Sequence, residues 1–347
     1  MSGKSSFLNE RKGKRTVHMK KISLWLVLGF LLGGASAWGQ AKVGTAGLQF
    51  LEIGVSARAS AMGNAFTAVV GDVYGVYYNA AGLAAVPRRQ VAFTHIDYPA
   101  GIHYEFAALA LPVRKLGGVL AVSVYDFQSG DIPVTSYNFP SGTGEVTKAQ
   151  DLALGVTFAR YLTDHFSFGV TGKFIVESLD DREASGWAAD VGTLYETGFR
   201  NFRIAMRISN FGPNFRFGPS DEGFKDFPLP IDFHFGTAID VVQSSRHRTT
   251  LAFEGSHPAD NLEKFNTGLE YWYSEKVALR FGVNIRQDTD AQEVLTEDTR
   301  KFTTGVGMAA GAGFKLPVQR FNLTADYAFQ DAHDLGSFHR WSVSFTF

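Results

Sequence analysis

The chain has 347 residues, of which 45% are hydrophobic, 14% aromatic and only 19% charged, and it contains no cysteine. Its charged share lies below the ~25% usual in soluble domains, whereas 31 Phe and 37 Gly are unusually many. A formal net charge of −1 offers no basic field for nucleic acid. The lack of cysteine excludes disulfide scaffolds, thiolate metal sites and cysteine nucleophiles.

The first 40 residues have the pattern of a secretory signal. Two lysines precede an apolar run from Ile22 to Leu32, which is only about half as long as the ~20 residues of a spanning helix. Ala35-Ser36-Ala37 follows as a small-residue cleavage site. The sequence therefore predicts export by a cleaved signal peptide that starts at Met19. Residues 1–18 are then an extension or an over-long reading of the gene, and an uncleaved anchor is the alternative.

Alternation of apolar and polar residues predicts β-strands along most of the remaining chain. The last nine residues are the clearest case, because their apolar and polar side chains fall on opposite faces of one strand. The apolar face carries Trp341, Val343, Phe345 and Phe347. A strand that ends on an aromatic residue in this way resembles the assembly signal of bacterial outer-membrane barrels.

Such strands fit either a soluble sandwich or a membrane barrel, and three features favour the barrel. The strands run ~10 to 12 residues, enough to cross a bilayer at the usual tilt. Their polar faces mix charged and small residues, which suits a lumen. Aromatic residues gather near strand ends, as in interfacial girdles. The aromatic residues concerned are Tyr161, Tyr195, Tyr271, Trp272, Tyr273 and Trp341.

Counting the alternating segments predicts an all-β fold, a transmembrane antiparallel β-barrel of about 14 strands over residues 89–347. The expected strands are 90–97, 105–113, 117–127, 149–162, 166–179, 186–196, 202–212, 231–242, 248–256, 264–273, 277–287, 302–314, 321–331 and 337–347. Long connections are expected at 128–148, 180–185, 213–230, 257–263 and 288–301, alternating with short ones. This alternation is typical of barrels with short periplasmic turns and longer external loops.

Residues 41–88 do not alternate. Small residues dominate there, with single large apolar ones between them, which predicts a compact hatch or plug in the mouth of the barrel. Arg58 stands alone in an Ala/Ser-rich stretch. We expect it to form a buried ion pair with a carboxylate of the barrel wall, and a direct ligand contact is the alternative.

The same segment carries a family resemblance. The run from Phe50 to Gly63, together with Asp72 and the run from Tyr78 to Ala84, is similar to the opening of the PorV/PorQ family. That family belongs to the FadL-like, fourteen-stranded outer-membrane barrels, whose hatch carries an Asn-Pro-Ala-Gly element. This chain has Asn79-Ala80-Ala81-Gly82 in its place, without the proline.

The resemblance implies two functions, and the residues leave the choice open. PorV-like proteins are accessory or shuttle components of type IX protein secretion. FadL-like proteins transport hydrophobic small molecules, such as long-chain fatty acids, across the outer membrane. A third reading is a structural barrel that anchors partner proteins through its loops. The expected partners are accordingly outer-membrane lipid, the barrel assembly machinery, and secretion components with their cargo or a hydrophobic small molecule.

Candidate site residues follow from the hatch and from the resemblance. The hatch and ligand-gate candidates are Phe50, Leu51, Arg58, Phe66, Asn79 and Gly82. In FadL-like transporters a kink in the third strand opens the wall sideways. Gly130 and Pro133, which closely follow the predicted third strand, are the candidates for that kink.

Patterns for catalysis and cofactors are missing from the sequence. It has no phosphate-binding loop, no H-E-x-x-H pair and no G-x-S-x-G elbow. His95 and His103 flank a turn and are interpreted as solvated side chains. We therefore expect a protein that is not an enzyme, with no catalytic residues, cofactor, metal or nucleic-acid partner, in the bacterial outer membrane.

Overall fold

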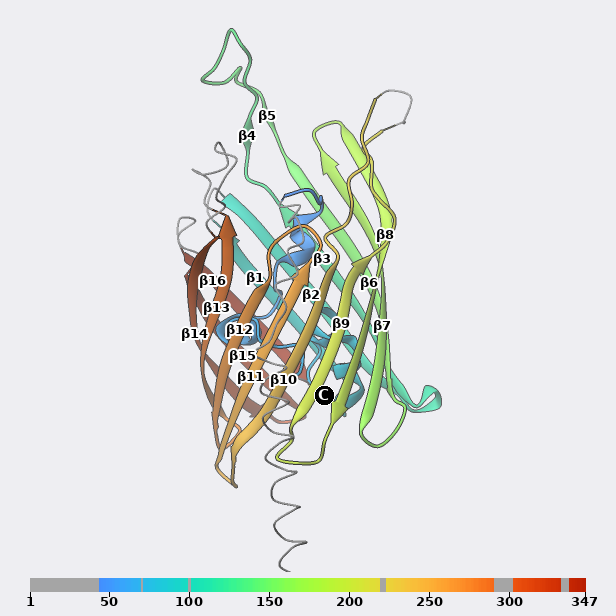
Figure 1. Ribbon diagram of the computed structural model, residues 1–347, viewed down its shortest axis with the longest axis vertical. Helices are drawn as coiled ribbons and strands as arrows, with labels where there is room; N and C mark the ends of the chain where they lie inside the picture. The colour runs from blue at the N-terminus through green and yellow to red at the C-terminus, as the bar shows by residue number, and fades with distance from the viewer. Residues whose placement is uncertain (1–43, 70, 99–100, 219–222, 290–301, 332–336) are drawn as a thin grey trace, which may run out of the picture. The chain divides into compact units, whose positions relative to one another are not determined.

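Fourteen strands close into one antiparallel barrel in the computed structural model (Figure 1). The structure describes residues 44–69, 71–98, 101–218, 223–289, 302–331 and 337–347. The predicted signal peptide, residues 1–40, lies outside them. No helix among the described residues is long and apolar enough to cross a membrane.

The predicted strand positions are confirmed to within a few residues. The barrel strands are β1 (Gln90–Tyr98), β2 (Ile102–Val113), β3 (Gly118–Gln128), β6 (Ala149–Tyr161), β7 (Phe166–Leu179), β8 (Arg182–Glu196), β9 (Arg203–Phe211), β10 (Asp232–Gln243), β11 (His247–Pro258), β12 (Lys264–Tyr273), β13 (Val277–Thr289), β14 (Phe302–Val318), β15 (Phe321–Asp331) and β16 (Ser337–Thr346). Short helices precede or connect them: η1 (Gln49–Glu52), α2 (Ala57–Ala61), α3 (Gly75–Tyr78), η2 (Ala80–Ala85) and η4 (Arg114–Leu116).

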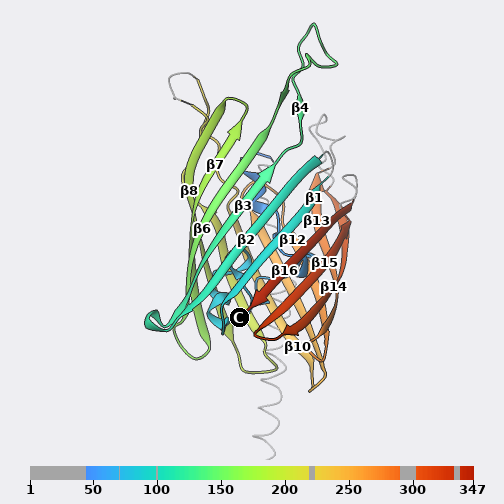
Figure 2. The same ribbon diagram turned by 180° about the vertical axis from the view of Figure 1, so that it is seen from behind.

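Each barrel strand pairs with its neighbours along the chain, and the last strand closes on the first. β16 lies beside β1 (Figure 2), with Gln90 opposite Thr346 and Asp97 opposite His339. Closure gives every strand a partner on both sides, so the barrel leaves no open sheet edge. The predicted antiparallel fourteen-stranded barrel is therefore confirmed.

The candidate residues for a kink in the third strand lie outside the paired part of the wall. β3 pairs with β2 and with β6 without a register shift over its whole length. Gly130 and Pro133 lie beyond its end, and Pro133 belongs to a two-stranded hairpin of β4 (Ile132–Pro133) and β5 (Val146–Thr147). Figure 1 shows this hairpin projecting past the barrel. The glycine and proline therefore shape a loop and do not interrupt the wall.

Two smaller expectations also need correction. The connection expected at 180–185 is only a turn at 180–181, because β8 begins at Arg182. Trp272 does not belong to an outer girdle, because its side chain is buried and lies over the guanidinium of Arg280. Tyr195, Tyr273 and Trp341 are exposed, as a girdle requires.

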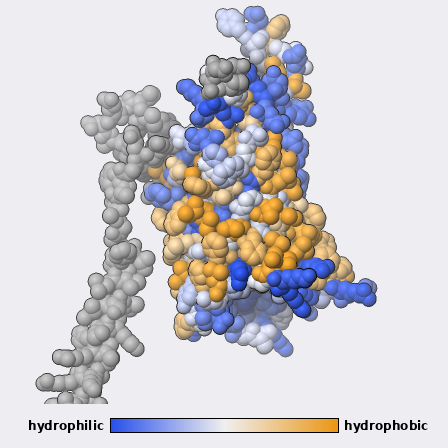
Figure 3. Space-filling model, turned by 90° about the vertical axis from the view of Figure 1, so that its right-hand side faces the viewer, coloured by the Kyte–Doolittle hydropathy of each residue, from blue (hydrophilic) through white to orange (hydrophobic). Residues whose placement is uncertain are grey.

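The outward face of the wall is apolar, as the alternation predicts. Along β10 to β13 the exposed large side chains include Phe233, Leu251, Phe253, Phe265, Leu269, Leu279, Phe281 and Ile285. Figure 3 shows hydrophobic residues gathered over the middle of one side, with hydrophilic residues above and below. This arrangement matches an apolar band between two polar interfaces.

Residues 44–69 and 71–89, here called the N-terminal segment, pack against the inward faces of the strands. η2 contacts β6, β7 and β8, whereas α2 contacts β13 to β16. Figure 1 shows the segment, in blue, surrounded by the strands. The segment therefore bridges opposite sides of the wall, and the site described next lies along this contact.

Candidate functional site

Glycines in the wall let the N-terminal segment approach the strands closely. A Cβ at Gly282 of β13 would collide with the backbone of Met62 and Gly63, and one at Gly169 of β7 would collide with the backbone of Ala80. A side chain at either position would push the segment away from the wall. These glycines are needed for close backbone approach rather than for a turn.

Replacing Gly282 by alanine is expected to loosen the N-terminal segment. Overpacking a filled site costs about 1–3 kcal/mol, and about 1.4 kcal/mol corresponds to a tenfold change in an equilibrium. Chymotrypsin should therefore cut the segment in the folded barrel about tenfold faster. Gly172→Ala is the matched control, because a Cβ at that position of β7 meets nothing within 4 Å. Equal cleavage of both variants would contradict the close contact.

An apolar core fills the space between the N-terminal segment and the wall on the side of β1 to β3. Phe50 packs against Phe127 in a tilted arrangement with 6.5 Å between ring centroids, and Tyr74 stacks against Phe106 at 5.8 Å. Phe50, Leu51 and Phe66 are 2%, 4% and 1% exposed. Three of the predicted gate residues are thus core residues in this state.

Arg58 forms the predicted ion pair with the wall. Its guanidinium donates two hydrogen bonds of 2.7 Å to the carboxylate of Glu270 on β12, and a third of 2.7 Å to Asp72. Burial alone would lower the pKa of Arg58, but Glu270 raises it above its ordinary value. The N-terminal segment is therefore fixed to the wall by a cation that stays charged.

The ion pair continues into the wall as a buried network. Arg280 on β13 donates 2.7 Å hydrogen bonds to Glu270 and to Asp326 on β15. The side chains of Glu270 and Arg280 are fully buried. Two cations thus share Glu270, which satisfies the usual requirement that buried charges be paired.

Asn79 holds the turn before η2 although the proline of the family element is missing. Its side-chain oxygen accepts a hydrogen bond from the backbone N–H of Ala81 at 3.1 Å. Its amide nitrogen donates to the carbonyls of Thr67 at 3.0 Å and of Thr193 at 3.2 Å, the latter on β8. Asn79 therefore caps η2 and ties it to the wall, and the adjoining Gly82 is buried.

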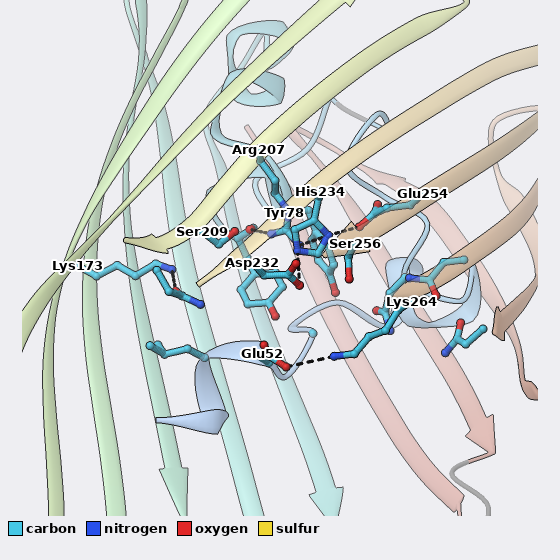
Figure 4. A pocket seen from close by; sticks show the side chains of 17 residues that line it. Glu52, Tyr78, Lys173, Arg207, Ser209, Asp232, His234, Glu254, Ser256 and Lys264 are labelled. Carbon is cyan, nitrogen blue, oxygen red and sulfur yellow. Dashed lines mark hydrogen bonds and ion pairs between the residues drawn. The ribbon is translucent and has the colours of Figure 1, made fainter. Parts of the chain in front are cut away.

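A cavity of about 150 Å³ lies between the N-terminal segment and the wall (Figure 4). The segment contributes Leu51, Glu52, Gly54, Asn64, Tyr77 and Tyr78. The wall contributes Lys173, Arg207, Ser209, Asn210, Asp232, His234, Glu254, Ser256, Lys264, Asn266 and Asn284. This lining is mostly charged or amide, so the cavity suits water or a small polar solute rather than a hydrocarbon.

The wall side of the cavity is a chain of charged contacts. The His234 ring lies between Asp232, 2.9 Å from Nε2, and Glu254, 2.8 Å from Nδ1. Glu254 accepts hydrogen bonds from the backbone N–H groups of Phe66 and Thr67 at 2.8 and 2.7 Å. These contacts give the N-terminal segment a second polar attachment to the barrel.

Some residues that line the cavity also carry polar atoms that are left unpaired within the described part of the chain. Glu52 contacts Lys264 at 3.3 Å through one carboxylate oxygen, and burial raises the pKa of the Glu52 carboxyl although Lys264 opposes the shift. Several lining residues carry a buried polar atom with no hydrogen-bond partner within the described part of the chain. They are Glu52, Asn64, Arg207, Ser209, Asp232 and Asn284.

The wall beside this cavity carries an irregularity that the sequence analysis missed. The register between β8 and β9 shifts between Ala189 and Val191. Asn210 on β9 has a φ of +60°, and its side chain accepts a 2.8 Å hydrogen bond from Lys173. Lys173 also pairs with Asp190 at 2.7 Å, so polar groups fill the bulge.

The C-terminal residues lie where the alternation places them. Trp341 and Phe347 are exposed, with Val343 and Phe345 partly buried between them. The backbone N–H of Phe347 donates to the carbonyl of Arg89 at 2.9 Å. Their part in barrel assembly stays a prediction.

The sequence of residues 36–257 matches the family described as "Type IX secretion system protein PorV". The match covers more than half of the chain. The chain belongs to the PorV family. Membership and the closed barrel together indicate an outer-membrane protein. A comparison with curated proteins found no match.

The fold of this PorV-family chain is similar to that of solved outer-membrane barrels. The toluene transporter TodX of Pseudomonas putida superposes with a TM-score of 0.59 at 11% identity, covering 84% of this chain and 98% of TodX. The toluene transporter TbuX of Ralstonia pickettii gives 0.53 at 11% identity, covering 84% and 97%. At such identities the likeness concerns the fold alone.

Proposed function

We propose that this chain is an accessory or shuttle barrel in type IX-like protein secretion, with the N-terminal segment as a fixed hatch. The observation that carries this proposal is the attachment of the segment. Arg58 joins it to Glu270 on β12, and Glu254 on the adjacent strand β11 joins it to the wall a second time, both through buried charged contacts. Such contacts are costly to break, so the barrel serves as a rigid body rather than as a conduit.

Transport of a hydrophobic molecule is the second candidate, because the similar folds TodX and TbuX are toluene transporters. A route for such a molecule needs an apolar cavity and a gap in the wall. The cavity beside the N-terminal segment is lined mostly by polar and charged residues. β3 pairs continuously with both neighbours. These two features favour the secretion role.

A disulfide between the N-terminal segment and the wall separates the two functions. A Cβ at Gly236 would lie 3.0 Å from that of Thr67, within about 1 Å of the ~3.8 Å typical of a disulfide. The chain has no cysteine, so Thr67→Cys/Gly236→Cys forms one defined bond. A fixed hatch still functions when it is locked, whereas a moving hatch does not.

The test compares a deletion strain with strains carrying the wild-type or the locked chain. We expect the deletion to retain secreted proteins in the periplasm and the locked chain to restore secretion fully. Uptake of labelled oleate should be equal in all strains. If instead the deletion strain lost oleate uptake, and the locked chain restored it only after the disulfide was reduced, the proposal would be replaced by gated transport. The reduced double variant is the control for the two substitutions.

A further inference from the structure

Two histidines and two carboxylates form a compact group on the outward face of β1 and β2. His95 and Asp97 are two residues apart on β1, and His103 and Glu105 are two residues apart on β2. His95 is directly opposite Glu105, and Asp97 is directly opposite His103. The four side chains therefore occupy one square of the sheet, next to the turn that joins the strands.

Three of these residues place a metal-ligand atom within reach of one ion. Asp97 Oδ1 lies 3.2 Å from His95 Nε2 and 3.1 Å from His103 Nδ1. The three ligand atoms all lie within 4.8 Å of one another. When two ligand atoms each lie about 2.0 Å from a tetrahedral Zn²⁺ ion, they are about 3.3 Å from each other. Both distances in this group therefore fit one coordination sphere.

Glu105 supplies a second, independent feature of a metal site. Its carboxylate lies 2.5 Å from Nδ1 of His95, and an ionised carboxylate only accepts hydrogen bonds. Nδ1 of His95 therefore donates its proton to Glu105, and Nε2 is the ring nitrogen that faces Asp97. A histidine that binds a metal usually donates its other ring N–H to a carboxylate in this way.

The charges around the group favour a cation. Asp126 on β3 is directly opposite Glu105, so a third carboxylate adjoins the square. Among the described residues, no lysine or arginine forms an ion pair with Asp97, Glu105 or Asp126. The ligand side chains are 44–60% exposed, so an ion reaches them from outside the barrel.

We propose that His95, Asp97 and His103 bind one Zn²⁺ ion, with Glu105 as the residue that positions His95. Two imidazole nitrogens and one carboxylate oxygen are ligands typical of zinc. Three protein ligands leave a position open for water or another oxygen ligand. The site stands on the β1–β2 hairpin and does not depend on the secretion role.

The test measures zinc binding by the untagged protein, purified in detergent and freed of metal with a chelator. We expect isothermal titration with Zn²⁺ to show one site per chain. His95→Gln and His103→Gln each remove one ligand and should abolish this site. Glu105→Gln keeps all three ligands and should weaken binding about 10- to 100-fold. His257→Gln is the control, because His257 contacts a single carboxylate, Glu263, at 3.2 Å.

Cobalt gives a readout that a purely structural role would not change. Co²⁺ in the site should produce the visible absorption of a four-coordinate ion, and the band should disappear in His103→Gln but persist in His257→Gln. Heat-modifiable gel mobility checks that every variant is folded. Wild-type protein that binds no Zn²⁺, or His95→Gln and His103→Gln proteins that bind it as tightly as wild type, would overturn the proposal.

Discussion

Arg58→Met is expected to lower the free energy of unfolding by about 3 kcal/mol. Removing one partner of a buried ion pair costs about 3–5 kcal/mol, because the remaining charge stays buried without compensation. Glu270 keeps its 2.7 Å hydrogen bond to Arg280, which places the expected loss at the lower end of that range. Guanidinium unfolding in detergent, followed by tryptophan fluorescence, measures the change.

The control for this variant is an exposed ion pair in a loop. Arg216 contacts Asp226 through side chains that are 31% and 46% exposed, and such pairs contribute about 0–1 kcal/mol. Arg216→Met should therefore leave stability almost unchanged. If Arg58→Met lowers the free energy of unfolding no more than Arg216→Met does, the Arg58–Glu270 ion pair does not anchor the N-terminal segment. The fixed hatch then loses its main support.

The strands were predictable because each carries the period of two that a wall with one apolar and one polar face imposes. The apolar–polar alternation is lost where a strand extends beyond the apolar band. Residues Arg182 to Ser185 extend β8 but carry no large apolar side chain, so they were expected to be loop. Trp272 was misplaced because it lies between Tyr271 and Tyr273, and an aromatic run hides which face is inward.

The partners within the lumen were less predictable than the strands. Alternation indicates that Glu270, Arg280 and Asp326 face inward, and Arg58 was expected to meet a carboxylate. Which carboxylate it meets depends on the path of the N-terminal segment across the barrel. That path is set by contacts between residues 212 positions apart, which no local pattern reveals.

The histidine group on β1 and β2 differs from the Arg58 contact, because here a local sequence pattern predicts which residues meet. His95 and Asp97 precede the turn with a spacing of two, and His103 and Glu105 repeat that spacing after it. In a tight hairpin these four residues must fall on one face. Each histidine taken alone predicts only a solvated side chain.

Leu269→Arg is expected to destabilise the barrel in lipid by about 2–4 kcal/mol, the cost of arginine on the lipid face at the bilayer midplane. Leu269 stands near the middle of β12 and is 41% exposed. Its cross-strand neighbours, Leu251 on β11 and Phe281 on β13, are also exposed and apolar. Neither offers a partner for a guanidinium, so the charge must be desolvated or drawn to the interface.

Tyr273→Arg is the matched variant, because Tyr273 lies on the same strand and face but at its end. Near the interface the cost falls to about 0–1 kcal/mol. Reversible folding of urea-denatured protein into phospholipid vesicles measures both variants. If the outward face met water, Leu269→Arg would be as mild as Tyr273→Arg, and the barrel would then have no membrane around it. A difference of about 2 kcal/mol or more between the two variants would instead place the middle of β12 in the hydrocarbon layer.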